Sequence, residues 1–140
     1  MAVNRLKEMT GDLKGRTVGL LGLSFKPNTD DMRDAPSIDV AKALQEQGAS
    51  VRAYDPVAME VAAPLMPDVE MVTDPYTMAE GCDALMVMTE WNEFKHLDFV
   101  RIREMMKNPV VFDGRNIYEP ELLRGLGFNY RGFGRGYNGQ

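Results

Sequence analysis

Residues 17–23 read TVGLLGL, an almost continuously apolar run of strand length. Residues 84–89 and 110–112 are runs of the same kind. Strands with unbroken apolar character are typical of a parallel sheet whose two faces are both covered. Three further runs rich in β-branched and aliphatic residues lie at 51–54, 69–72 and 128–131. The sequence therefore predicts about six strands.

Helical patterns separate these strands. Residues 37–47 place Ile38, Ala41 and Leu44 at helical spacing, and Gly48 follows as a typical helix stop. Further helices are predicted over residues 57–63, between Asp74 and Gly81, and between Asp98 and Asn108. Strands that alternate with helices predict an α/β fold: a doubly wound (Rossmann-like) parallel sheet of about six strands with helices on both faces.

The two ends of the chain depart from this alternation. Val3, Leu6 and Met9 share one face of a helix that is expected to stop at Thr10 and Gly11. We expect residues 1–14 to be the end of a helix connecting this domain to another one. Residues 15–134 are expected to form the domain itself. Residues 135–140 are expected to be a flexible tail, because the end of the chain is rich in glycine.

Composition and charge exclude several classes of function. The 140 residues are 44% hydrophobic and carry a net charge of -5, which fits a globular core and excludes a broad basic surface for nucleic acid. No apolar run approaches the roughly 18 residues of a membrane-spanning helix. Cys82, the single cysteine, allows no internal disulfide, fits the cytoplasm and is interpreted as a small buried residue. With His96 as the one histidine, no metal site is predicted.

The loop after the first predicted strand, residues 24–36, is long and polar. A dinucleotide-binding turn would place G-x-G-x-x-G here, and the sequence lacks it. Lys26 and Arg33 are donors suited to phosphate oxygens, and aspartates at positions 30, 31 and 34 are available to hold them in place. The alternative interpretation is a solvated loop with local ion pairs.

Two more loops leave predicted strands with unusual residues. Residues 89–94 read TEWNEF and residues 112–116 read FDGRN. The glycine of the second loop allows a sharp turn that points Arg115 across the strand ends. Because parallel strands end at a common edge, Lys26, Arg33 and Arg115 are expected to converge there. A local basic cluster in an acidic chain favours a small polyanion, such as a nucleotide diphosphate.

At these loops the sequence resembles a known family. Residues 22–37 (GLSFKPNTDDMRDAPS) are similar to the opening of the C-terminal, UDP-binding domain of the UDP-glucose 6-dehydrogenases, within the UDP-glucose/GDP-mannose dehydrogenase family. The segments YDP at 54–56, TEW at 89–91 and FDGR at 112–115 match the same pattern in order and spacing. The resemblance extends from about residue 15 to residue 134.

The resemblance implies one part of a larger NAD-dependent oxidoreductase. Such enzymes convert UDP-glucose to UDP-glucuronate, for polysaccharide biosynthesis, in two successive hydride transfers, and they form homodimers. On the matching positions, Phe25, Lys26 and Arg115 are expected to bind the UDP-sugar substrate, and Arg33 to approach NAD. The domain that binds most of the NAD, and the segment with the catalytic cysteine, lie outside this sequence. The chain alone is therefore expected to hold no catalytic residue and to be inactive.

The residues leave other functions open. One is a stand-alone nucleotide-binding or regulatory module. Another is a dehydrogenase for GDP-mannose or UDP-N-acetylmannosamine, since those relatives share the architecture. A third is an α/β domain that only supports a dimer. Arginine, glycine and aromatic residues interleave at 131–137 as in RNA-binding segments, but two arginines in an acidic chain supply little affinity for RNA.

Overall fold

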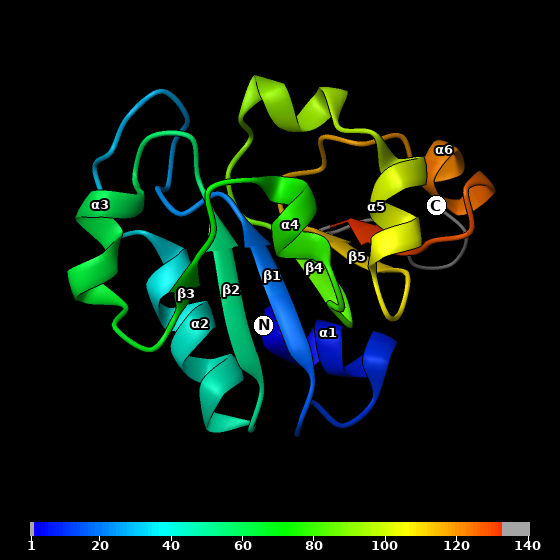
Figure 1. Ribbon diagram of the computed structural model, residues 1–140, viewed down its shortest axis with the longest axis horizontal. Coiled ribbons are helices and arrows are strands. Elements are labelled where there is room, and N and C mark those ends of the chain that lie inside the picture. The colour runs from blue at the N-terminus through cyan, green and yellow to red at the C-terminus, as the bar shows by residue number, and fades with distance from the viewer. Residues whose placement is uncertain (1, 133–140) are drawn as a thin grey trace.

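In the computed structural model, which describes residues 2–132, six strands form one parallel sheet (Figure 1). The strands are β1 (Thr17–Leu21), β2 (Ser50–Tyr54), β3 (Glu70–Met71), β4 (Ala84–Val87), β5 (Val110–Asp113) and β6 (Asn129–Gly132). The predicted doubly wound α/β fold is confirmed. The tail expected at 135–140 lies outside the described residues.

The order of the strands creates a switch point beside β1. In the sheet the order is β3-β2-β1-β4-β5-β6, so the chain runs from β1 outward to β3, returns to β4 and continues to β6. Leu21, the last residue of β1, is in register with Tyr54 on one side and Val87 on the other. In such sheets ligands bind beyond the carboxyl ends of the strands, where the winding direction reverses.

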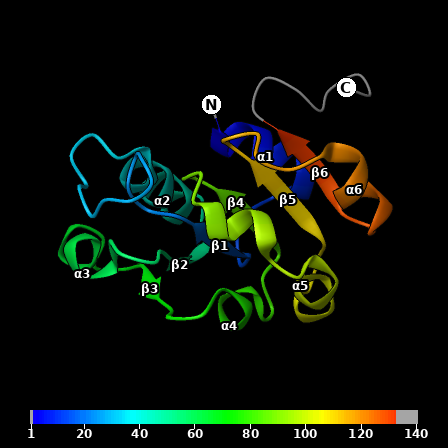
Figure 2. The same cartoon turned by 90° about the horizontal axis from the view of Figure 1, so that it is seen from above.

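Helices cover both faces of the sheet (Figure 2). They are α1 (Ala2–Thr10), α2 (Pro36–Glu46), α3 (Met59–Ala62), α4 (Pro75–Ala79), α5 (Phe99–Met105) and α6 (Pro120–Gly125), with short 3-10 turns at Ala63–Leu65 and Asn92–His96. Asp74 and Asp98 cap α4 and α5 by accepting hydrogen bonds from the backbone amides of Tyr76 and Arg101. No helix within residues 2–132 is long and apolar enough to cross a membrane.

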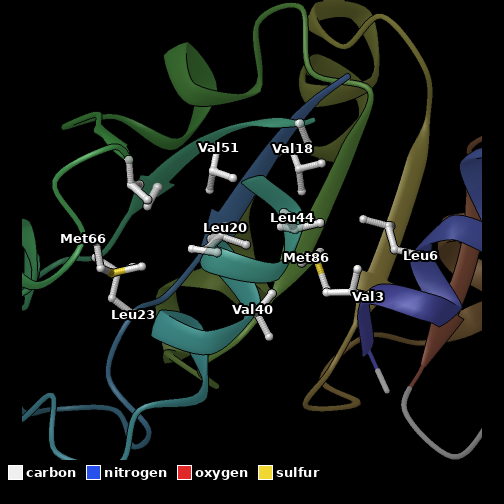
Figure 3. Close-up of a cluster of buried hydrophobic side chains, with 14 of the residues drawn as sticks. Val3, Leu6, Val18, Leu20, Leu23, Val40, Leu44, Val51, Met66 and Met86 are labelled. Atoms are coloured by element: carbon white, nitrogen blue, oxygen red, sulfur yellow. The ribbon is translucent and has the colours of Figure 1, made fainter. Parts of the chain in front are cut away.

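The sheet separates two clusters of buried side chains. Val18 and Leu20 of β1 pack with α1 and α2 on one face (Figure 3), whereas Leu21 packs with residues of α4, α5 and α6 on the other. Successive residues of a strand point to opposite faces, so one apolar run supplies both clusters. This explains why β1, β4 and β5 lack the polar alternation of a half-exposed strand.

Helix α1 is a component of the first cluster. Val3 and Leu6 are buried among side chains of α2, β4 and β5 (Figure 3). The helix begins beside the carboxyl ends of the strands, where Ala2 lines a cavity with Phe25, and ends near their amino ends, where Thr10 lies in a hollow with Asp83. Its interpretation as the end of an interdomain helix stays a prediction.

Candidate functional site

Asp55, the first residue after β2, ties three loops together at the carboxyl edge of the sheet. Its side chain is fully buried. Oδ2 accepts hydrogen bonds from the Leu23 amide at 2.8 Å and from Nε1 of Trp91 at 3.3 Å. Oδ1 accepts from the amides of Val57 and Ala58, both at 2.8 Å. Donors from the loops after β1, β2 and β4 therefore converge on one carboxylate, which compensates its buried charge.

Asp113, the last residue of β5, shapes the neighbouring loop in the same way. It is fully buried, and its Oδ1 accepts from the Arg115 amide at 3.1 Å. Oδ2 accepts from the amides of Ile117 and Tyr118 and from the hydroxyl of Tyr130, at 2.8, 3.0 and 2.7 Å. The backbone that carries Arg115 is thus fixed to the end of the strand.

A close approach joins the loops after β1 and β4. Gly22 has a positive φ of 95°, and a Cβ atom there would collide with the side chain of Thr89. The Thr89 hydroxyl donates to the carbonyl of Ser24 at 2.5 Å. Only glycine provides both the left-handed backbone and the space that this contact needs.

Arg115 and Phe25 meet above these contacts. Cζ of Arg115 lies 5.4 Å from the centroid of the Phe25 ring, and Nη2 donates to Oε2 of Glu90 at 2.8 Å. The Arg115 side chain is 29% exposed. Burial alone would raise the pKa of Glu90, but the hydrogen bond and charge of Arg115 bring this pKa below its ordinary value. The site thus presents a half-buried guanidinium held by one carboxylate and one aromatic face.

An apolar cavity of about 280 Å³ opens beside Arg115. Phe25, Val40, Val87 and Phe112 are among the residues that line it, and Arg115 is its charged member. A cavity with apolar walls and one cation suits a ligand that combines a flat or apolar group with a negative charge.

Lys26 lies next to Phe25 on an exposed part of the loop. The hydroxyl of Ser24 donates to the Lys26 carbonyl at 2.7 Å, which fixes the backbone at this point. No described residue forms a hydrogen bond or ion pair with the Lys26 ammonium group. The backbone of Lys26 thus follows Phe25, the residue whose ring lies near the Arg115 guanidinium.

Arg33 makes its side-chain bonds within its own loop. Nε and Nη2 donate to the two carboxylate oxygens of Asp31 at 3.0 and 2.7 Å, and the Arg33 side chain is 87% exposed. The hydrogen bonds from Arg33 lower the pKa of Asp31 to about 2. The surroundings of Arg33 thus agree with the alternative interpretation, a solvated loop with local ion pairs. The structure joins Phe25 to Arg115, and it records no contact of Arg33 with either residue.

Cys82 and His96 are weaker candidates for a chemical role. Cys82 is fully buried, its Sγ lies 3.0 Å from the Met78 carbonyl, and burial raises the pKa of the thiol to about 11, so little of it is the reactive thiolate. His96 is exposed. Within residues 2–132, no group of three histidine, cysteine or acidic side chains is placed to hold a metal ion.

Sequence reasoning missed the three acids that organise this site. Asp55 and Asp113 both stand where an apolar strand meets a turn-forming Pro or Gly, and this position was their signal. Glu90 gave a weaker signal, because an acid beside a tryptophan is common on protein surfaces.

Comparison with known proteins shows which family the chain belongs to. Residues 19–120 match the family model described as "UDP-glucose/GDP-mannose dehydrogenase family, UDP binding domain". A UDP-glucose 6-dehydrogenase of Rhizobium meliloti is 50% identical over 125 residues, which cover 89% of this chain and 29% of that protein. The chain therefore spans less than a third of the length of this relative.

Two solved structures are similar over most of the chain. A UDP-glucose dehydrogenase from Pyrobaculum islandicum is 41% identical with a TM-score of 0.73, covering 83% of this chain and 26% of its own. The NDP-N-acetyl-D-galactosaminuronic acid dehydrogenase of Methanosarcina mazei Go1 is 30% identical with a TM-score of 0.82, covering 96% and 28%. The similarity thus includes the sheet and the loops at its carboxyl edge.

Proposed function

The chain belongs to the UDP-glucose/GDP-mannose dehydrogenase family as its UDP-binding domain, and from this premise we propose that its carboxyl edge binds the UDP part of a UDP-sugar. The complete enzyme is proposed to be an NAD-dependent UDP-glucose 6-dehydrogenase, a cytoplasmic homodimer that forms UDP-glucuronate. The choice of glucose is supported by the 50% identity to a UDP-glucose 6-dehydrogenase.

The observation that carries the proposal is the placement of Arg115. Its guanidinium stands at the switch point of the sheet, beside an apolar cavity, and against the ring of Phe25. A guanidinium matches two phosphate oxygens at once, and a partly desolvated site strengthens such hydrogen bonds. Lys26 is proposed to add a second cation for the diphosphate.

The described residues do not fit NAD as a bound cofactor on their own. The loop after β1 reaches the next helix only at Pro36, so no tight turn places a helix N-terminus against a dinucleotide pyrophosphate. NAD is therefore proposed to bind mainly outside this chain and to supply the hydride acceptor there. Arg33, exposed on its loop, is proposed as the contribution of this chain.

Isothermal titration of the 140-residue chain with UDP tests the proposal. We expect weak but saturable binding, and we expect Arg115→Ala to weaken it by at least about tenfold, because a charge-assisted bond to phosphate is lost. Arg101→Ala is the matched control, since Arg101 lies against Tyr76 on another part of the surface. Equal affinities of the unchanged chain and the Arg115→Ala variant would remove Arg115 from the site.

A further inference from the structure

In the ion pair between Glu90 and Arg115, only one of the two carboxylate oxygens accepts a hydrogen bond from a described residue. Oε2 of Glu90 accepts from Nη2 of Arg115 at 2.8 Å. Oε1 of Glu90 is buried and has no hydrogen-bond partner among the described residues. The guanidinium and the carboxylate therefore meet at a single point instead of the two parallel bonds that arginine and carboxylate can form.

Stability of the fold does not explain this arrangement. A partly exposed ion pair contributes little to stability, and both side chains here are about one-third exposed. A buried acceptor without a donor is unfavourable. The Glu90 carboxylate thus contributes little to the stability of the fold. Its main effect is on the orientation of the Arg115 side chain.

The single contact leaves most donors of Arg115 available. The Arg115 backbone is fixed by Asp113, one corner of the guanidinium by Glu90, and one face lies near Phe25. Nε and Nη1 donate to no described residue. The guanidinium is therefore held in place while its other N–H groups make no bond to described residues. Two oxygens of one phosphate could accept hydrogen bonds from these groups.

We propose that Glu90 is a positioning residue, which holds Arg115 in the orientation that binds the phosphates of UDP. The proposal rests on the proposed function, since it assumes that UDP binds here. It predicts that removing the Glu90 side chain weakens UDP binding, whereas the charge of Glu90 alone would predict the opposite. Removing a negative charge near a diphosphate should strengthen binding, whereas releasing the Arg115 side chain should weaken it, because its freedom must then be lost on binding.

Two substitutions of Glu90 separate these effects. Glu90→Ala removes both the charge and the acceptor, and we expect UDP affinity to fall about tenfold. Glu90→Gln removes the charge but keeps an oxygen for Nη2 of Arg115, and we expect affinity equal to that of the unchanged chain or greater. Glu93→Ala is the matched control, because Glu93 lies in the same loop and bonds to Tyr54 instead of Arg115. It should change the affinity by less than about twofold.

A second measurement reports on Arg115 without ligand. In nitrogen-edited NMR spectra, the Nε–H signal of Arg115, assigned by its loss in Arg115→Ala, should be sharp in the unchanged chain and in Glu90→Gln. In Glu90→Ala it should broaden or move toward the shift of a solvated arginine. Thermal melting checks that each variant is folded.

The outcomes separate the two proposals. If UDP binds the unchanged chain and Glu90→Ala binds as tightly or more tightly, the positioning role is wrong and the proposed function stands. If Glu90→Gln loses as much affinity as Glu90→Ala, an oxygen acceptor for Nη2 of Arg115 does not preserve binding, and the positioning role is again wrong. If the unchanged chain does not bind UDP, the proposed function fails and the role of Glu90 toward phosphate fails with it.

Discussion

Single buried acids determine the shape of the binding edge at the scale of residues. Asp55 and Asp113 each accept hydrogen bonds from backbone amides of the loops that they anchor. A buried carboxylate is stable when donors surround it, whereas buried donors that lose the carboxylate are left without an acceptor, which is unfavourable. The conformation of the loops at this edge therefore depends on these two side chains.

Replacing Asp113 by alanine should be strongly destabilising. The substitution removes the acceptor of the buried Tyr118 amide and the nearer of two acceptors of the buried Tyr130 hydroxyl, and we expect the free energy of unfolding to fall by about 3 kcal/mol. Urea denaturation of the variant and the unchanged chain measures the difference. Glu104→Ala, at an exposed position of α5, should stay within about 0.5 kcal/mol of the unchanged chain. A similar small loss in Asp113→Ala would contradict the anchoring role.

Gly22→Ala should be more destabilising than Gly81→Ala. Both glycines have positive φ, 95° and 73°, but a Cβ at Gly22 would collide with Thr89, whereas one at Gly81 meets nothing within 4 Å. Gly81→Ala should lower the free energy of unfolding by about 1–2 kcal/mol, the cost of a positive φ in a residue with a Cβ. Gly22→Ala should have this cost and should also disrupt the packing between two loops. Chemical denaturation of both variants gives the comparison. Equal losses would mean that the loops can move apart freely.

At the scale of elements, what could be predicted from the sequence depended on periodicity. The strands were predictable because β1, β4 and β5 are buried on both faces. Helix α6 was not predicted, because Leu123 is buried and Leu122 is exposed within six residues, too short a stretch to show a periodic face. Parallel topology predicted that Lys26, Arg33 and Arg115 converge, but it did not predict the contact of Phe25 with Arg115. The role of Glu90 did not, since it depends on how two loops pack.

Helix α4 carries a prediction on pH. The amide of Tyr76, and then the hydroxyl of Thr77, hold the pKa of Asp74 below its ordinary value of 3.8. A lowered folded pKa stabilises the protein above the unfolded pKa, and this stabilisation is lost as the pH falls through the folded pKa. Asp74→Asn, which keeps a neutral cap, should therefore lose less stability than the unchanged chain when the pH falls below about 4. Denaturation at pH 6 and pH 3 tests this; parallel losses would contradict it.

At the scale of the whole molecule, we propose that the chain forms one side of a reaction site. It spans 29% of the length of the Rhizobium meliloti relative. The described part contains the apolar cavity beside Arg115 that we propose as the UDP site, but its cysteine is buried and has a raised pKa. The expectation that this domain is one part of a larger enzyme could not be derived from periodicity or charge, and it rested on the resemblance of the loop at residues 22–37.

The chain alone should show no dehydrogenase activity. Mixed with UDP-glucose and NAD, it should give no rise in NADH absorbance, because the buried Cys82 thiol can neither reach a substrate nor ionise readily. The control is a UDP-glucose 6-dehydrogenase of full length under the same conditions. Turnover by the 140-residue chain, abolished by Cys82→Ser, would show that the site is complete within it.

The burial of Cys82 also makes the molecule convenient to label at a chosen place. Ser50 is exposed at the first residue of β2, at the end of the sheet opposite to Phe25 and Arg115. A Ser50→Cys substitution would add an accessible thiol to a chain whose own sulfhydryl is shielded. Maleimide chemistry could then attach a fluorophore or a sensor chip at that point and leave the loops of the proposed UDP site facing the bulk solution.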